Sequence, residues 1–417
     1  MTRLCAWLGV VALAGSVLAA QGASFRRAGG DARNVMLTAP RIAPVPASQW
    51  TDAQRAVAAT YGSSGNSDNQ LATLLNHPEM AAALLPVVKY FSEESELSPR
   101  QRETLILRTA WLSGSEYIWA HHAVAARRLG FSQEDLQRIA DGPLAGPSPE
   151  FFLIVAADEL HGNSAMSDAT WKALSNQLNQ HQLMDATFTV PAFTLLAIVD
   201  KSLGVQLESG ITERLPGAAR ISPVAPGPNH DERPAAARIA PLEQSDWTPE
   251  IRKMLDPTGS GRNPIAVYRT FARHPKLYAP RQLLSEHIRL QNTLSARVRE
   301  MLILRMGWIG QSEYEWQQHA RTGRAAGLDT ERVARGPDAP DWDPLDRALL
   351  RAADEMYRND MVSDATWNAL KPHFDTKQMM DVLVTAGGYR MVSTVLNAFG
   401  VQLEPGNERF PAVPWSW

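Results

Sequence analysis

The sequence predicts an all-α protein made of two tandem helical domains related by internal duplication. Residues 97–130 match residues 294–327 at 18 of 34 positions without a gap, at an offset of 197. Shorter motifs also return: RIAP at Arg41 and Arg238, SDATW at Ser167 and Ser363, and GVQLE at Gly204 and Gly400. The repeated unit therefore has the size of a domain, far above the roughly 20–50 residues of a solenoid repeat.

Helices explain the pattern within each half. Ala, Leu, Arg, Glu, Gln and Met, all good helix formers, dominate the chain, and no stretch alternates apolar and polar residues over the length of a strand. Capping boxes at Thr51 and Ser98 and a further helix start at Thr248 mark N-termini, whereas Gly130 and Gly327 stand where helices stop. We expect about six to eight helices in each domain.

The longest repeated segment predicts a helical hairpin. One helix over residues 98–112 and a second over residues 116–129 are separated by Ser113-Gly114-Ser115, and Gly310-Gln311-Ser312 makes the same break in the other copy. Ser312 and Glu315 also fit a capping box, which would give Glu315 a structural role.

Further segments flank the two domains. Residues 1–20 combine a positive start, an apolar core and small residues near their end, which is typical of a cleaved secretion signal. An uncleaved membrane anchor is the alternative, although the apolar run is short for a bilayer. We expect a first domain over residues 41–216, a Pro-rich linker over 217–237 and a second domain over 238–411, in a periplasmic or secreted protein.

Composition excludes several classes of function. The only cysteine, Cys5, lies in the predicted leader, so the mature chain would have no disulfide, thiolate metal site or cysteine nucleophile. A net charge of −3 without a basic run argues against a nucleic-acid partner, and against a membrane partner once the leader is removed. HExxH, P-loop and Gly-x-Ser-x-Gly patterns are absent. We therefore expect no metal and no cofactor.

A pair of ionisable residues recurs on the inward faces of the predicted hairpin. His122 and His319 each follow a tryptophan by three residues, on an apolar stripe of the second helix. Glu103 and Glu300 lie on the apolar face of the first helix, where a carboxylate needs a partner. If the two helices fold back on each other, Glu103 meets His122 and Glu300 meets His319.

Such a pair in an apolar pocket can take a proton from one substrate atom and return it to another. Arg108 and Arg305, one turn beyond the glutamates, are candidates for binding a substrate carboxylate. Each assignment has a structural alternative. The Glu–His pair can be a satisfied core contact, Trp119 and Trp316 can be core side chains, and the arginines can pair with a helical carboxylate.

The segments RETLILRTAWLSGSEYIWAHHAVAARRLGFS and REMLILRMGWIGQSEYEWQQHARTGRAAGLD resemble the core motif of the carboxymuconolactone decarboxylase and alkylhydroperoxidase-D-like superfamily. The resemblance covers the hairpin of each half. It implies an all-α, alkylhydroperoxidase-D-like fold that forms homo-oligomers, with a tandem copy replacing a dimer by one chain. The Cys-x-x-Cys pair of the alkylhydroperoxidase branch falls on Ser115 and Ile118, and on Ser312 and Glu315, so thiol peroxidase chemistry is not expected.

The decarboxylase branch works without those cysteines, and the resemblance implies acid–base chemistry on a small carboxylated lactone or a related ring compound. It makes His122 and His319 the acid–base groups, and Glu103 and Glu300 the orienting or relaying carboxylates. The pocket lining that it implies is Glu116, Tyr117, Trp119, Glu313, Tyr314 and Trp316.

We thus expect an exported, cofactor-free lyase, decarboxylase or isomerase that acts on a small cyclic acid as a homo-oligomer. A non-catalytic binding or scaffolding protein is the alternative, and an alkylhydroperoxidase-type activity is disfavoured by the missing cysteines. Glu315 stands where the first copy has Ile118, so the two pockets differ in charge. The sequence leaves open whether one copy or both are active.

Overall fold

The chain folds as two helical copies, seen in a computed structural model that describes residues 25–27, 37–61, 68–145, 150–217, 221–223 and 233–414. The helices of the first copy are α2 (Asp52–Tyr61), α3 (Asn69–Leu74), α4 (Pro78–Lys89), α5 (Pro99–Ser113), α6 (Glu116–Arg128), α7 (Gln133–Asp141), α8 (Phe151–Asn163), α9 (Asp168–Ser175) and α10 (Gln180–Leu203). Those of the second are α11 (Pro249–Leu255), α12 (Ala266–Phe271), α13 (Pro275–Glu286), α14 (Ala296–Ile309), α15 (Glu313–Ala325), α16 (Thr330–Arg335), α17 (Pro344–Asn359), α18 (Asp364–Leu370) and α19 (Thr376–Phe399).

The prediction of an all-α protein with two tandem copies is confirmed. Each copy has nine α-helices within the described residues, more than the six to eight expected, because short helices such as α3 and α16 count among them. A five-residue π-helix follows the same helix in both copies, as η3 (Tyr90–Glu94) after α4 and as η7 (His287–Gln291) after α13. The short 3-10 helices of the described part of the chain are η2 (Ala47–Gln49), η4 (Gly142–Ala145) and η6 (Gln244–Asp246). The strands described, β1 (Phe25–Arg27) and β2 (Ile221–Pro223), form one antiparallel pair.

Local sequence signals set the helix ends much as predicted. The Ser98 hydroxyl accepts the backbone N–H of Gln101, and the Gln101 side chain caps Ser98 in return, so this capping box is confirmed. The Thr248 side chain accepts the N–H of Ile251 at the start of α11. Gly130 and Gly327 follow α6 and α15 with φ of 86° and 84°, in the left-handed region that glycine adopts without strain.

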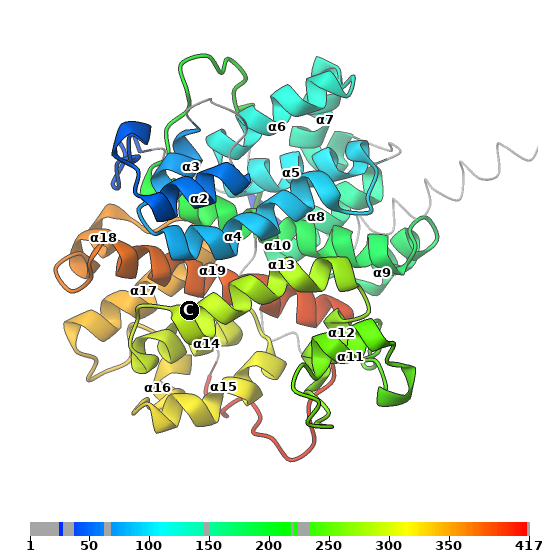
Figure 1. Ribbon diagram of the computed structural model, residues 1–417, viewed down its shortest axis with the longest axis vertical. Coiled ribbons are helices and arrows are strands. Elements are labelled where there is room, and N and C mark those ends of the chain that lie inside the picture. Colours follow the sequence, from blue (N-terminus) through cyan, green and yellow to red (C-terminus); the bar gives the residue numbers. More distant parts are fainter. Residues whose placement is uncertain are drawn as a thin grey trace, which may run out of the picture.

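The longest helices, α10 and α19, pack against each other at the centre of the molecule, where the two copies meet (Figure 1). α4 and α13 also contact each other across this boundary. Among the described helices, α10 alone is long and apolar enough to cross a membrane. However, 94% of its apolar window is buried inside the protein, as expected of a core helix in a globular protein.

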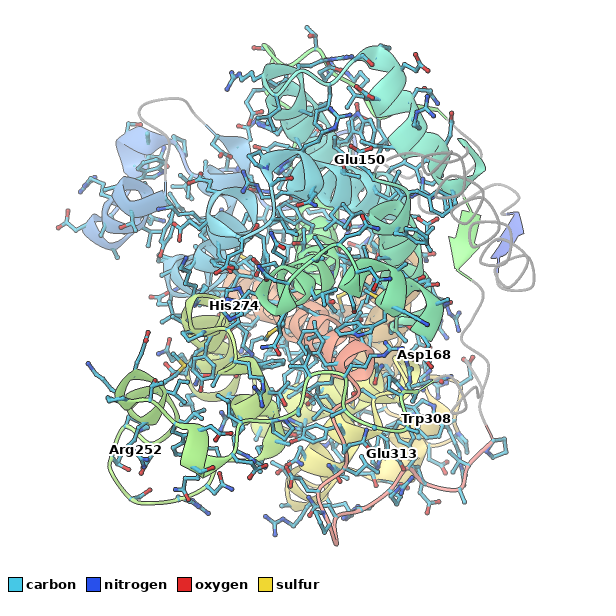
Figure 2. The ribbon with its side chains drawn as sticks, turned by 90° about the vertical axis from the view of Figure 1, so that its right-hand side faces the viewer. Glu150, Asp168, Arg252, His274, Trp308 and Glu313 are labelled. Carbon is cyan, nitrogen blue, oxygen red and sulfur yellow. The ribbon has the colours of Figure 1, made fainter. Side chains whose placement is uncertain are left out.

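Two of the repeated sequence motifs bind each other across the boundary. Arg41 of the first RIAP motif donates to the Val362 carbonyl at 2.8 Å and pairs with Asp364 of the second SDATW motif at 2.6 Å. Reciprocally, Arg238 donates to the Met166 carbonyl at 2.8 Å and pairs with Asp168 at 2.5 Å. Figure 2 shows Asp168 at the level where the copies meet. The copies are therefore related by an approximate two-fold arrangement, in which each clamps the other.

The predicted leader, residues 1–20, lies outside the described residues, as does most of the predicted linker over 217–237. The domain boundaries at 41–216 and 238–411 therefore stay predictions. The reciprocal clamps start at Arg41 and Arg238, the first residues of these two ranges.

Candidate functional site

An αα-hairpin in each copy carries a glutamate and a histidine towards each other. In the second copy, α14 begins after Ser295, whose side chain accepts the N–H of Val298, and its second turn carries Glu300. The chain reverses through Gln311, whose φ of 52° is left-handed, and α15 runs back along α14. Gly114, with φ of 65°, makes the same reversal in the first copy without a side-chain penalty.

The expected contact between the glutamate and the histidine is confirmed in both copies. His122 Nδ1 lies 2.8 Å from Oε2 of Glu103, and His319 Nδ1 lies 2.8 Å from Oε2 of Glu300. The glutamate side chains are 5% and 4% exposed and the histidines 17% and 16%, so each imidazole is the more accessible partner. With Nδ1–H donating to the carboxylate, Nε2 of each ring is left as the basic nitrogen.

A cavity of about 360 Å³ borders the pair in the second copy. This volume suits a small ligand. Its polar lining includes three arginines and two carboxylates as well as the imidazole: Arg281, Arg289, Arg299, Glu300, Glu315 and His319. Tyrosines and aliphatic side chains complete the wall, among them Tyr268, Tyr314, Tyr389, Leu284 and Ile288. The cavity thus brings positive groups, carboxyl groups and an imidazole together around one small space.

Comparison with protein families reaches both hairpins. Residues 78–146 and residues 275–355 each match the model of the carboxymuconolactone decarboxylase family. The family model therefore matches the chain twice, once in each copy. The first match runs from α4 to the short helix after α7, and the second from α13 into α17, so each includes one Glu–His pair. A search among curated proteins finds no significant match.

Of the pocket-lining residues that the carboxymuconolactone decarboxylase resemblance implies, Tyr314 borders the cavity. Its hydroxyl donates to Glu404 at 3.2 Å and accepts the Val267 N–H at 3.1 Å. Tyr117 has similar partners in the first copy, donating to Asp68 at 2.9 Å.

The other implied lining residues contact the rest of the protein. Trp119 and Trp316 are 1% and 0% exposed in the core, as the structural alternative has it. Glu313 pairs with Arg409 at 2.6 Å and accepts the N–H of Phe410, so it holds the segment that follows α19. Glu116 accepts the Leu215 N–H at 3.2 Å after α10 in the same way.

The arginines that were expected to bind substrate also have partners within the protein. Arg108 and Arg305 are 0% exposed. Arg305 makes a bidentate pair with Asp354 at 2.6 and 2.9 Å and donates to the Ala334 carbonyl at 2.6 Å. Arg108 does the same with Asp158 at 2.6 and 2.9 Å. Their guanidinium groups are therefore satisfied within the protein, which favours the structural alternative of a pair with a helical carboxylate.

Two important groups were missed or misread from the sequence. Glu315 does not cap α15, because the Ser312 side chain makes no capping bond; Glu315 is instead 6% exposed, with Oε2 3.7 Å from His319 Nε2. Burial raises the pKa of Glu315, outweighing the attraction of His319 and Arg281. The Tyr389 hydroxyl of α19 lies 3.2 Å from His319 Nε2, and burial holds the pKa of this phenol well above its usual range.

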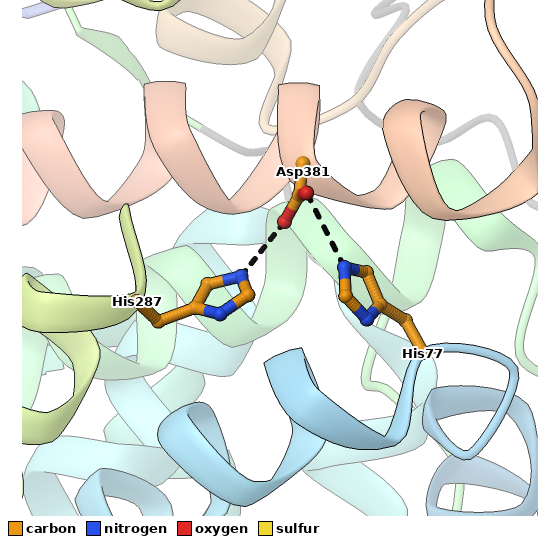
Figure 3. A group of neighbouring side chains, drawn as sticks. All are labelled: His77, His287 and Asp381. Atoms are coloured by element: carbon orange, nitrogen blue, oxygen red, sulfur yellow. Dashed lines mark hydrogen bonds and ion pairs between the residues drawn. The ribbon is translucent and has the colours of Figure 1, made fainter. Parts of the chain in front are cut away.

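A second ionisable cluster lies between the copies. His287 and His77 approach the two carboxylate oxygens of Asp381 through their Nε2 atoms, at 2.8 and 3.2 Å (Figure 3). Thr293 also donates to Asp381 through its backbone N–H and hydroxyl, at 2.8 and 2.7 Å. Burial alone would raise the pKa of Asp381, but these hydrogen bonds hold it well below its usual range.

The possible metal-ligating atoms of His77, His287 and Asp381 lie close enough together to hold one cation. A metal-bound imidazole ordinarily passes its other N–H to an acceptor. Within the described chain, however, Nδ1 of buried His287 has no hydrogen-bond partner. The equivalent cluster of the other copy replaces this histidine by Tyr90, which donates to Asp185 at 2.8 Å and lies 3.1 Å from His274 Nε2. The phenol of Tyr90 thus makes the hydrogen bond that the imidazole of His287 makes in the other cluster. We therefore interpret both clusters as hydrogen-bonded contacts between the copies and not as metal sites.

Proposed function

We propose that the protein is an exported, cofactor-free enzyme that moves protons on a small cyclic carboxylic acid or lactone, as a decarboxylase, another lyase or an isomerase. The observation that carries this proposal is the Glu300–His319 contact of 2.8 Å at the edge of a 360 Å³ cavity. The match of both copies to the carboxymuconolactone decarboxylase family model supports the reaction class.

The chemistry uses the imidazole as the proton carrier. Nδ1–H of His319 is held by Glu300, so Nε2 takes a proton from a substrate carbon next to a carbonyl or carboxylate group. The Glu300 carboxylate stabilises the imidazolium that forms, because an ionised partner favours the charged ring. The ring then returns the proton to another atom of the substrate.

Turnover of a panel of cyclic carboxylic acids and lactones, followed by mass spectrometry on the leaderless protein, tests this function. We expect one or more panel members to be converted, with a bell-shaped pH dependence and without added metal or cofactor. Glu300→Gln and His319→Gln together with the matching changes in the first copy should abolish the conversion. Retained turnover in that quadruple variant contradicts the mechanism.

Two other outcomes point to the other functions. Binding of panel members without any conversion favours a non-catalytic binding protein. Consumption of peroxide by the leaderless protein, whose sequence after residue 20 contains no cysteine, favours a peroxidase.

A further inference from the structure

The two Glu–His pairs have different neighbours. In the second copy, Nε2 of His319 faces the Tyr389 hydroxyl at 3.2 Å and Glu315 at 3.7 Å. The offsets of 197 and 196 place Ile118 and Phe193 at the equivalent positions of the first copy. The Phe193 ring indeed packs edge-on against His122, with centroids 5.2 Å apart, as Tyr389 does against His319 at 5.0 Å. The first imidazole therefore meets hydrocarbon where the second meets an acid and a phenol.

The second copy also has positively charged side chains where the first copy has neutral ones. Arg281 and Arg289 line the cavity of the second copy, and the offset of 197 places Leu84 and Ser92 at their positions in the first. Arg281 is 8% exposed and packs over the Phe271 ring at 4.7 Å. Arg289 is exposed and donates to the Tyr268 hydroxyl at 2.7 Å.

Among the described residues, no carboxylate lies within 4.0 Å of the guanidinium of Arg281 or Arg289. A nearly buried guanidinium without a carboxylate partner is costly, unless an anion reaches it. The cavity wall therefore offers two positive groups to a ligand, from α13 and from the π-helix η7 that follows it. The carboxylate, imidazole and phenol come from α15 and α19.

We propose that the second copy is the working site and that it takes a small anionic carbon acid, with its anionic group on Arg281 and Arg289. In this assignment, which rests on the proposed function, His319 is the base, Glu315 in its protonated form is the acid, and Tyr389 positions the imidazole. The first copy keeps the Glu103–His122 contact as part of its core.

The proton balance of this assignment closes without a co-reactant. His319 Nε2 takes the proton as a substrate C–H bond breaks, while Glu315 gives its carboxylic proton to the substrate carbonyl oxygen, and an enol forms. For a substrate with a carbon–carbon double bond conjugated to this enol, the enol returns its O–H proton to Glu315 as the carbonyl re-forms, the double bond shifts, and the imidazolium protonates the far carbon of the original double bond. Burial raises the pKa of Glu315, which favours the protonated form that the first step uses.

Benzoate is a suitable probe for the anion site, because binding can be read without turnover. In the full mature chain, we expect benzoate to protect His319, and not His122, from modification by diethyl pyrocarbonate, as mapped by peptide mass spectrometry. Arg281→Leu, which installs the residue of the first copy, should weaken this protection about tenfold or more, because a charge-assisted hydrogen bond is lost. Arg351→Met, which changes an exposed arginine paired with Asp338, is the control and should leave protection unchanged. Equal protection of both histidines, absence of protection, or full protection in Arg281→Leu overturns the assignment.

Exchanging residues between the copies tests the catalytic part. The double variant Glu315→Ile/Tyr389→Phe converts the second site to the residues of the first, and we expect it to lose turnover of any converted panel member while it still unfolds cooperatively. His122→Gln should retain turnover and His319→Gln should lose it; the reverse result overturns the assignment but leaves the proposed acid–base function intact. If benzoate protects His319 but no panel member is converted, the anion site is supported and the proposed enzymatic function is contradicted.

Discussion

Replacing Arg305 by methionine tests whether this side chain anchors the fold. Its guanidinium binds Asp354 through two hydrogen bonds of 2.6 and 2.9 Å and also donates to the Ala334 carbonyl at 2.6 Å. Methionine keeps much of the volume but leaves the Asp354 carboxylate, which is 7% exposed, without its partner. Breaking a buried pair from one side costs about 3–5 kcal/mol. We therefore expect the free energy of unfolding to fall by about that amount.

Urea unfolding followed by far-UV circular dichroism measures the change. Arg108→Met should show a similar loss, because the Arg108–Asp158 pair has the same two distances of 2.6 and 2.9 Å. Arg351→Met is the control, since its pair with Asp338 is exposed and such pairs contribute only about 0–1 kcal/mol. An Arg305→Met protein that unfolds like the control refutes the anchoring role and makes Arg305 a candidate for ligand binding again.

Three further substitutions test other parts of the structure. Glu315→Gln should stabilise the protein near neutral pH, because a raised folded pKa makes stability fall as pH rises above the ordinary value of 4.5; the gain over the native protein should vanish below that pH in thermal unfolding. Asp381→Asn should destabilise the protein, because the hydrogen-bonded carboxylate between the copies has a depressed pKa. Its contribution to stability is present above the ordinary pKa of 3.8 and is lost as pH falls, so the melting temperatures of the native and variant proteins should converge in acid. Gly336→Ala should lower the free energy of unfolding more than Gly327→Ala does. Both glycines have φ of 84°, a left-handed backbone that costs alanine about 1–2 kcal/mol, but only the new Cβ at position 336 would lie 2.5 Å from Arg305 Nη2. Equal losses of stability in urea unfolding would contradict this close approach.

The Glu–His contacts could be predicted from the sequence because they depend on local rules. Glu300 and His319 lie on the inward faces of consecutive helices, and a short break between the helices brings those faces together. The duplication strengthened the prediction, since the same spacing occurs with Glu103 and His122.

The partners of these residues could not be predicted, because they come from distant elements. Tyr389 lies 70 residues from His319 along the chain, and Asp354 lies 49 residues from Arg305. The spacing of residues within one helix does not predict contacts between helices that are far apart in the sequence. Glu315 was misread for a related reason: its spacing from Ser312 satisfies a capping box, but burial beside the cavity offers the carboxylate other neighbours. A signal did exist in the duplication, at positions where one copy is polar and the other apolar, as with Tyr389 and Phe193.

The mutual packing of α10 and α19 has a consequence for how this molecule can diverge. In an assembly of identical chains, every mutation appears in all subunits, so a residue that improves one pocket alters all the others. Joining two copies in one chain removes this coupling, because one copy can keep its original pocket residues while the other copy acquires new polar groups. Selection then acts on the two interiors separately, although neither half is released from the surface that both must share.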